Sequence, residues 1–189
     1  MKKNRISKNW INKQRRDIYV RRSKVDGYRS RAAYKLIEID EKFKIFKNGI
    51  SVIDLGSAPG SWSQYLSKKI KNSKIVSIDL REMDAIDNTI QVLGDFTEEK
   101  NQSKIKGFFK SNVDVVLSDM AVNTTGNKNI DSIYTGELCM EAMLFSKKIL
   151  NNDGKFISKI FMGSIFNEII TEAKLIFREV KVFKPKSSR

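Results

Sequence analysis

A glycine-rich turn follows the first apolar run of the chain and is suited to a nucleotide-like ligand. It occupies residues 54–62, DLGSAPGSW, and precedes a helical pattern. Glycines such as Gly60 permit positive φ and close approach of a ligand, and the following helix start offers unpaired N–H groups. The spacing is not the GxGxxG of dinucleotide enzymes, and Pro59 removes a backbone donor, so NAD is disfavoured. The alternative is a tight strand-to-helix connection that binds nothing.

Two further acids are expected at the same edge of the sheet as Asp54. Asp79 ends the second apolar run, and Asp95 follows the third run in the sequence LGDF. Asp79 stands where a carboxylate reaches the ribose hydroxyls of a bound nucleoside, and Asp95 could accept a hydrogen bond from an adenine amino group. Each acid taken singly could instead be a helix cap or a turn residue. Three acids after three successive strands favour a nucleoside site.

A parallel sheet is required to bring these residues together. Short apolar runs predict buried strands at 51–55, 75–80, 90–93, 113–118, 155–161 and 180–183. Helical spacing of apolar residues predicts helices at 61–70, 97–110, 134–150 and 164–177, with a break at Asn152-Asp153-Gly154 before the fifth strand. Strict alternation of strand and helix predicts an α/β, Rossmann-like, doubly wound sheet that binds ligands at the carboxyl ends of its strands.

Composition excludes several kinds of chemistry. The 189 residues include no histidine, so a Ser-His-Asp triad, a Cys-His dyad and an HExxH zinc helix are all absent. The single cysteine, Cys139, excludes an intramolecular disulfide and a thiolate zinc site, and no metal is expected. No apolar run is long enough to span a membrane, and the N-terminus lacks the apolar centre of a secretory signal. We therefore expect a cytoplasmic protein whose chemistry uses Lys, Asp, Glu, backbone groups or a cofactor.

The positive charge is concentrated at the N-terminus. The chain carries 36 basic and 22 acidic residues, a net charge of +14, and residues 1–35 hold thirteen Lys and Arg against two Asp. A solvated tail or an organellar transit peptide is one interpretation of this segment. The basic residues are, however, interleaved with aromatic ones, a mixture typical of segments that neutralise phosphates and stack on bases. These aromatic residues are Trp10, Tyr19, Tyr28 and Tyr34. An RNA or DNA partner is therefore predicted.

The motifs together resemble a known family. Residues 52–65 (VIDLGSAPGSWSQY), 118–121 (SDMA) and 159–161 (KIF) resemble the FtsJ/RlmE family of S-adenosylmethionine-dependent ribosomal RNA 2′-O-methyltransferases. The resemblance also includes 29–36 (RSRAAYKL) and 184–189 (KPKSSR), so it covers nearly the whole chain. It implies the class I methyltransferase fold, and it makes the basic N-terminus part of the family pattern instead of a transit peptide.

The resemblance also implies domains, a substrate and a partner. Residues 1–35 would be an RNA-binding segment and residues 36–189 the methyltransferase domain. The substrate would be a uridine ribose in the A-loop of 23S rRNA in the large ribosomal subunit. Related enzymes with these motifs act on tRNA riboses, which leaves tRNA as an alternative substrate. Nothing in the sequence predicts an oligomer, so a monomer is expected.

Roles for individual residues follow from the same resemblance. The cofactor, S-adenosylmethionine, would contact Gly60 and Trp62 at the first turn, Asp79 at the ribose and Asp95 at the adenine. Asp119 would lie beside the methionine part of the cofactor. It would also join Lys35 and Lys159 in a catalytic group.

Elementary chemistry limits what the lysines can do. Methyl transfer to a ribose hydroxyl is an in-line displacement, so the hydroxyl must be aligned and must lose its proton. A lysine accepts that proton only when neutral, which requires burial or a nearby like charge to lower its pKa. Lys35 could supply the like charge, whereas Asp119 would keep Lys159 charged. Whether Lys159 is a base or orients the hydroxyl stays open.

The chain departs from the family pattern at three places. Val122 replaces a proline of the family, and Ser61 replaces the second glycine of the turn. The family continues beyond the KPKSSR motif into a strand that bears a catalytic glutamate, and no residue here matches it. Glu179 is expected in solvent at the start of the last strand and does not take that role. Reduced activity is expected, and a non-catalytic RNA-binding or ribosome-assembly protein is the alternative.

Overall fold

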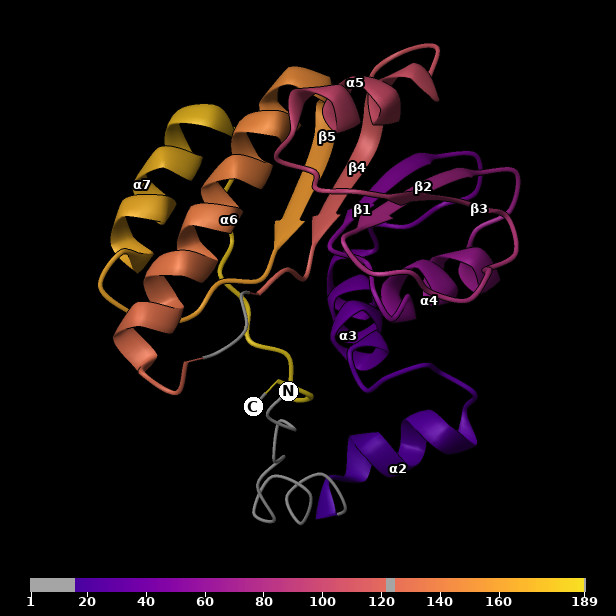
Figure 1. The fold of residues 1–189 in the computed structure, drawn as a ribbon, viewed down its shortest axis with the longest axis horizontal. Coiled ribbons are helices and arrows are strands. Elements are labelled where there is room, and N and C mark those ends of the chain that lie inside the picture. The colour runs from indigo at the N-terminus through magenta and orange to yellow at the C-terminus, as the bar shows by residue number, and fades with distance from the viewer. Residues whose placement is uncertain (1–15, 122–124, 189) are drawn as a thin grey trace, which may run out of the picture.

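The computed structural model describes residues 16–121 and 125–188, so Trp10 and Val122 lie outside the described part. In this described part, two helices precede the first strand, and strands and helices then alternate except that β3 follows β2 with no helix between them (Figure 1). The helices are α2 (Ile18–Val25), α3 (Ala33–Phe43), α4 (Ser61–Lys69), α5 (Glu99–Gly107), α6 (Lys128–Ile149) and α7 (Phe166–Ile176). The strands are β1 (Ser51–Leu55), β2 (Lys74–Asp79), β3 (Thr89–Leu93), β4 (Val113–Ser118) and β5 (Leu150–Ser158).

The strands form one parallel sheet of five strands in the order β3-β2-β1-β4-β5. The chain moves outward from β1 through β2 to β3 and then returns to the other side of β1 with β4. This reversal between β1 and β4 is the switch point at which ligands bind in such sheets. The arrowheads of β4 and β5 point toward α3 and the C-terminal segment (Figure 1). The predicted α/β fold is confirmed.

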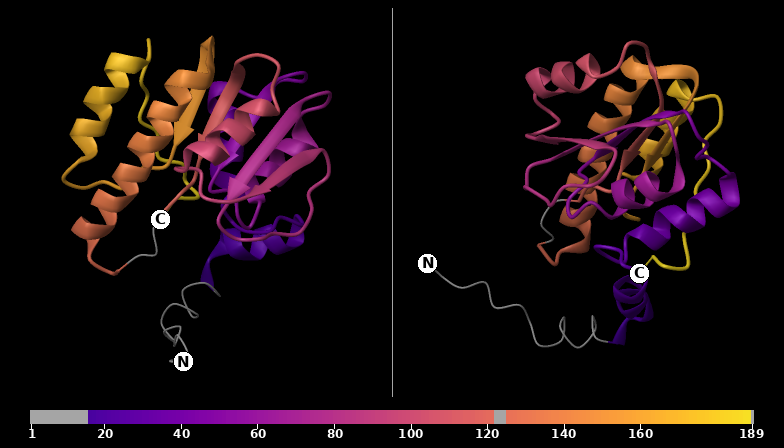
Figure 2. Two further views of the ribbon diagram at one scale, coloured as in Figure 1. Left: turned by 45° about the horizontal axis from the view of Figure 1, so that its top comes forward. Right: turned by 90° about the vertical axis from the view of Figure 1, so that its right-hand side faces the viewer.

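Two apolar cores cover the two faces of the sheet, because successive side chains of a strand point in opposite directions. On one face, Ile53 and Leu55 of β1 pack with residues of α5 and α6. On the other face, Val52 packs with Leu36 of α3 and Leu66 of α4. Helix α7 lies beside α6 in both views of Figure 2. Helices α3 and α4 therefore belong to the layer on this second face of the sheet.

The predicted break at residues 152–154 is wrong. Helix α6 ends at Ile149, and β5 starts at the next residue, so the Asn-Asp-Gly sequence lies inside the strand. Val113 of β4 pairs with Leu150 of β5, but Val115 pairs with Lys155, so the extra residues of β5 form an irregularity in the register. Side chains hold the segment in place, since Asn151 donates to Asp114 at 2.9 Å.

The strand predicted at 180–183 is also wrong, since this segment has no regular secondary structure. Its apolar residue Phe183 packs against a helix instead: the rings of Phe183 and Phe43 of α3 lie 5.6 Å apart, edge to face. The ammonium of Lys42 lies 4.3 Å from the centre of the Phe183 ring. Glu179 is exposed, as predicted, and pairs with Lys181.

The segment after Phe183 docks on α3. Glu38 of α3 accepts hydrogen bonds from the backbone N–H groups of Lys186, at 2.5 Å, and Ser187, at 3.0 Å. Arg31 joins this segment to α2, because it contacts the carbonyl of Ser187 and the carboxylate of Asp17, the N-cap of α2. Ser187 is fully buried. Among the described residues, no helix is long and apolar enough to cross a membrane.

Candidate active site

Asp119 is held between two lysines at the carboxyl edge of the sheet. The ammonium of Lys35 lies 3.0 and 2.9 Å from the two carboxylate oxygens of Asp119. The ammonium of Lys159 lies 3.0 Å from Oδ1 and donates to the backbone carbonyl of Asp119 at 2.7 Å. The residues come from α3, the end of β4 and the end of β5, so the sheet order and the docking of α3 bring them together. The predicted trio is therefore one cluster.

The cluster carries two positive charges and one negative charge in a partly buried setting. The side chains of Lys35, Asp119 and Lys159 are 22%, 16% and 22% exposed. Burial and the neighbouring Lys35 ammonium lower the pKa of Lys159 from its usual value, and the Asp119 carboxylate opposes this shift. A lysine with a lowered pKa has a larger neutral fraction near pH 7, and only the neutral amine accepts a proton.

The glycine-rich turn needs glycine for two different reasons. Gly60 has φ of +99°, and a Cβ atom there would lie 2.6 Å from Cδ1 of Ile86 and 2.8 Å from an arginine nitrogen of Arg29. Gly56 has φ of +69°, and a Cβ there would collide with the side chain of Met120, the residue after Asp119. The turn therefore lies tightly against both the loop after β2 and the residue beside the lysine cluster.

The acids that follow β2 and β3 both bind backbone groups. Asp79 accepts from the N–H of Ala58 in the turn and from the N–H of Arg81, each at 2.9 Å. Asp95 accepts from the N–H and the hydroxyl of Thr97 through Oδ1. No hydrogen bond to the other oxygen of Asp95 occurs in the described part of the chain. Asp79 thus fixes the turn, and Asp95 forms a local turn through Oδ1 alone.

Trp62 has a structural role that its motif position does not reveal. Its side chain is only 4% exposed, packed between α3 and α4. The indole N–H donates to the carbonyl of Ala32 at 2.8 Å, which ties α4 to the start of α3. A ligand at the sheet edge can meet only the main chain of Trp62 and not its ring.

Arg29 is a residue that the sequence analysis missed. Its guanidinium donates to three carbonyls, those of Pro59 at 3.1 Å, Asp84 at 2.9 Å and Ala85 at 2.8 Å. It therefore joins the N-terminal segment to the glycine-rich turn and to the loop after β2. Nothing in the spacing of the basic residues distinguishes Arg29 from its neighbours, so only the fold reveals it.

Asp54 is a buried acid beneath the same turn. It is 1% exposed and accepts a hydrogen bond of 2.6 Å from the hydroxyl of Ser63. Burial, with the carboxylates of Asp119 and Asp79, raises the pKa of Asp54 to about 7. The sequence signal for this buried acid is its position among the apolar residues of the 52–55 segment, VIDL.

The aromatic residues of the basic segment form a cluster. The ring of Tyr34 lies 5.4 Å from that of Tyr19 and 5.9 Å from that of Tyr28, and its hydroxyl donates to Asp26 at 2.6 Å. Tyr34 is 4% exposed, so the prediction that it stacks on bases is wrong for this residue. It is a core residue because α2 covers it. Tyr19 and Tyr28 remain half-buried.

Comparison with known proteins shows the family of this chain. The family model for FtsJ-like methyltransferases matches residues 28–189. Ribosomal RNA large subunit methyltransferase E of Pelagibacter ubique is 72% identical over 189 residues, which cover 100% of this chain and 93% of that protein. The protein of the same name from Rickettsia akari is 47% identical and is matched over 97% of this chain and 83% of its own length.

A solved structure shows the same fold. It is described as a ribosomal RNA methyltransferase from Plasmodium falciparum and superimposes with a TM-score of 0.77 at 36% identity. The match covers 85% of this chain and 93% of that one. The family model covers far more than half of the present chain. The motifs at 52–65, 118–121 and 159–161 meet at the edge of the sheet. The chain belongs to the FtsJ-like methyltransferase family.

Proposed function

We propose that this chain transfers a methyl group from S-adenosylmethionine to a ribose 2′-hydroxyl of a uridine in the A-loop of 23S rRNA. The observation that carries the proposal is the position of Asp119 between Lys35 and Lys159 at the switch point of the sheet. The relatives from Pelagibacter and Rickettsia, which cover nearly the whole chain, are named for methylation of large-subunit rRNA. No feature of the site favours tRNA over rRNA.

The residues at the sheet edge fit S-adenosylmethionine, which supplies an activated methyl group when bound. Gly60 leaves its main chain open to a ligand because it has no side chain. Asp79 would hold the ribose, and the second oxygen of Asp95 would accept from the adenine. The carboxylate of Asp119 would lie near the cationic sulfonium. Trp62 would contribute its main chain alone, since its ring is buried.

The lysine cluster suggests how the chain prepares the ribose hydroxyl. Asp119 fixes both ammonium groups by hydrogen bonds. Lys159, whose pKa is lowered by burial and by Lys35, would orient the hydroxyl and accept its proton. Lys35 would act through its charge and would not touch the proton. Holding the hydroxyl in line with the methyl group supplies a large part of the rate enhancement.

The substrate would approach from the side of α2 and α3. The exposed residues Arg16, Arg21 and Lys24 lie on or next to α2, and they suit contacts with the phosphates of an RNA strand. We propose the large ribosomal subunit as the partner. The chain would act there as a monomer, in the cytoplasm.

Transfer of radiolabelled methyl groups from S-adenosylmethionine to large ribosomal subunits that lack the modification tests the proposal. We expect label in the 23S rRNA, and its loss with Lys159→Ala and Lys159→Gln. Cofactor binding by both variants, measured by titration calorimetry, verifies that they are folded. Label in tRNA would overturn the rRNA assignment. Cofactor binding without transfer to either RNA would favour a non-catalytic role.

A further inference from the structure

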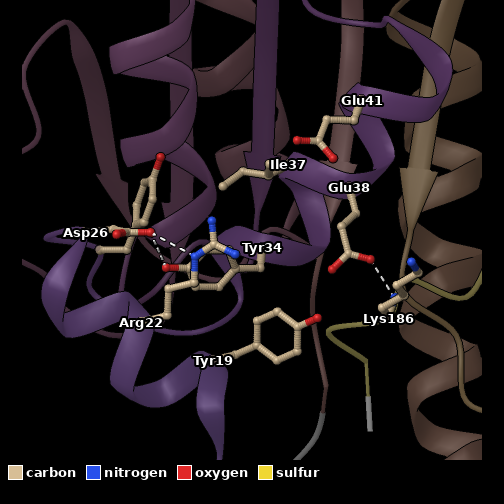
Figure 3. Close-up of a pocket in the computed structure, with 9 residues that line it drawn as sticks. Tyr19, Arg22, Asp26, Tyr34, Ile37, Glu38, Glu41 and Lys186 are labelled. Atoms are coloured by element: carbon tan, nitrogen blue, oxygen red, sulfur yellow. Dashed lines mark hydrogen bonds and ion pairs between the residues drawn. The ribbon is translucent and has the colours of Figure 1, made fainter.

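A pocket of about 380 Å³ lies on a second face of α3, between α2 and the C-terminal segment (Figure 3). Four residues of α3 line it at helical spacing: Tyr34, Ile37, Glu38 and Glu41. Lys35, the neighbour of Tyr34, points instead to Asp119. One rigid helix therefore carries both the pocket and a residue of the candidate active site, so a group held in the pocket would have a fixed position relative to that site.

Flat side chains form one wall of the pocket. Tyr19 is half-buried, its ring lies 5.4 Å from the ring of Tyr34, and the Arg22 guanidinium lies 5.1 Å above the Tyr34 ring. Figure 3 shows Arg22, Tyr34 and Tyr19 gathered on the same side of the pocket. Aromatic rings and guanidinium planes are the surfaces on which proteins stack unpaired bases. This wall is suited to a nucleobase.

The hydrogen-bonding groups of the pocket favour a base that donates. Asp26 is used by the Tyr34 hydroxyl and by Arg22, and Glu38 is used by the N–H groups of Lys186 and Ser187. Glu41 is exposed and makes no hydrogen bond or ion pair with any residue in the described ranges. Its two oxygens remain as acceptors. Three carboxylates against Arg22 and Lys186 make the pocket unfavourable for a phosphate.

A free carboxylate distinguishes between the bases. Guanine presents two adjacent donors, N1–H and the N2 amino group, which can meet both oxygens of one carboxylate. Uracil has a single N–H on that edge, flanked by carbonyl oxygens that would face the carboxylate. Adenine and cytosine place an acceptor next to their amino group. Glu41 therefore favours guanine over the other three bases.

We propose that this pocket binds one unpaired guanine of the substrate RNA, stacked on Tyr19 and Arg22 and held by Glu41. The inference rests on the proposed RNA substrate and adds a specificity site to it. Because α3 carries both the pocket and Lys35, it would fix the distance between this guanine and the ribose to be methylated. The exposed cations of α2 would contact the phosphates on either side of the guanine.

Fluorescence anisotropy with the whole chain and labelled RNA tests this site. The probes are oligouridylates of about eight nucleotides, one uniform, one with a central guanosine and one with a central inosine, which lacks the N2 amino group. We expect the guanosine oligomer to bind roughly tenfold more tightly than the uniform one, and inosine to lose most of this preference. Equal affinities of the wild-type chain for all three RNAs would overturn the proposal.

Variants identify the residues responsible. Glu41→Gln should remove the preference for guanosine, because an amide offers only one acceptor. Glu141→Gln, which removes the same charge from an exposed site on α6, should keep it. Tyr19→Ala should weaken binding of the guanosine oligomer, and Tyr19→Phe should restore it. If Glu41→Gln changed the affinities for all RNAs equally, the contact would be merely electrostatic and the proposal wrong.

Methyl transfer to large subunits, measured on the same preparations, separates the two proposals. Methylated rRNA without a preference for guanosine would overturn the pocket alone. A guanosine preference that depends on Glu41, in a chain that methylates no rRNA, would support the pocket and overturn the proposed reaction.

Discussion

Lys159 contacts Asp119 at two points, 2.7 Å from the backbone carbonyl and 3.0 Å from Oδ1 of the carboxylate. The contact with the carbonyl is a hydrogen bond, and the contact with the carboxylate is an ion pair. The same ammonium lies 5.7 Å from the centre of the Phe161 ring. These contacts fix the position of the Lys159 nitrogen at the edge of the sheet.

Removal of the Lys35 charge should change the pH dependence of methyl transfer. Because Lys35 lowers the pKa of Lys159, Lys35→Met should raise that pKa and reduce the neutral fraction. Activity should fall near pH 7 and recover partly in more alkaline buffer. Initial rates across the pH range measure this, and Lys47→Met, on an exposed site without a charged partner among the described residues, serves as the control. An unshifted profile for Lys35→Met would contradict the assigned role.

Asp119→Asn should remove most of the activity without unfolding the chain. The amide keeps the shape but cannot hold two ammonium groups, so we expect methyl transfer to fall by about 100-fold or more. Single-turnover rates with saturating cofactor measure the loss. Ser118 keeps its strand pairing with Leu55 and Ser158, so thermal unfolding should change by only a few degrees. Near-normal single-turnover rates would exclude a catalytic role for the carboxylate.

The buried carboxyl of Asp54 should make stability fall with rising pH. Its pKa is about 7 in the folded chain and about 4 in an unfolded one, so the folded state binds the proton more tightly. The resulting stabilisation is full at acid pH and is lost as the pH rises through about 7. The pKa values of Asp40 and Asp114 are lowered, because the hydrogen bonds that these carboxylates accept outweigh the raising effect of burial. These two groups therefore change the stability only at more acid pH.

Asp54→Asn provides the test, because the amide is neutral and can still accept from Ser63. Relative to the wild type, this variant should gain stability as the pH rises from about 5 to about 8. Urea denaturation across that range measures the free energy of unfolding of both chains. Parallel pH profiles would show that Asp54 has an ordinary pKa.

A side chain at Gly60 should weaken both folding and cofactor binding. Gly60→Ala places a Cβ at a positive φ, 2.6 Å from Ile86, and we expect a loss of about 1–3 kcal/mol in the free energy of unfolding. Gly107→Ala is the matched control, since that glycine ends α5 with open space around it. The control should be neutral or slightly stabilising. Urea denaturation measures the free energy of unfolding of both variants, and titration with S-adenosylmethionine measures their cofactor affinity. Equal losses in Gly60→Ala and Gly107→Ala would contradict the strain at Gly60.

Arg29→Lys should loosen the contact between the N-terminal segment and the glycine-rich turn. A lysine ammonium cannot reach the three carbonyls that the guanidinium spans. We expect the free energy of unfolding to fall by about 1–3 kcal/mol, together with weaker cofactor binding. Arg178→Lys, at an exposed ion pair with Asp153, is the control and should have little effect. Unchanged stability of Arg29→Lys would show that these bonds contribute nothing.

The sequence predicted the centre of the sheet well, because β1, β2 and β4 are mostly buried and appear as continuous apolar runs. The outer strands β3 and β5 are more exposed. β1 and β4 have the predicted bounds. The segment at 180–183 has the same local pattern but packs on α3, and no local signal separates a strand from an apolar loop that covers a helix. The lysine cluster was predicted from motifs alone, whereas its distances depend on how α3 docks.

Other features depend on long-range contacts that spacing does not encode. The indole N–H of Trp62 donates to the carbonyl of Ala32, and this bond holds the ring in the core. A cofactor contact of the Trp62 main chain stays a prediction. Arg29 finds its three acceptors only because the loop after β2 folds back over the glycine-rich turn. The pocket beside Tyr34 requires the C-terminal segment as a wall, so it could not be predicted from the basic segment itself.

The bonds from Glu38 to the backbone of Lys186 and Ser187 also bear on the order of folding. They join residues almost 150 positions apart, and such distant contacts form late because the intervening chain must be ordered first. During synthesis, α3 emerges from the ribosome early but lacks this support until residue 187 has been made. The surface of α3 around Glu38 is therefore completed only when the C-terminal segment docks on it.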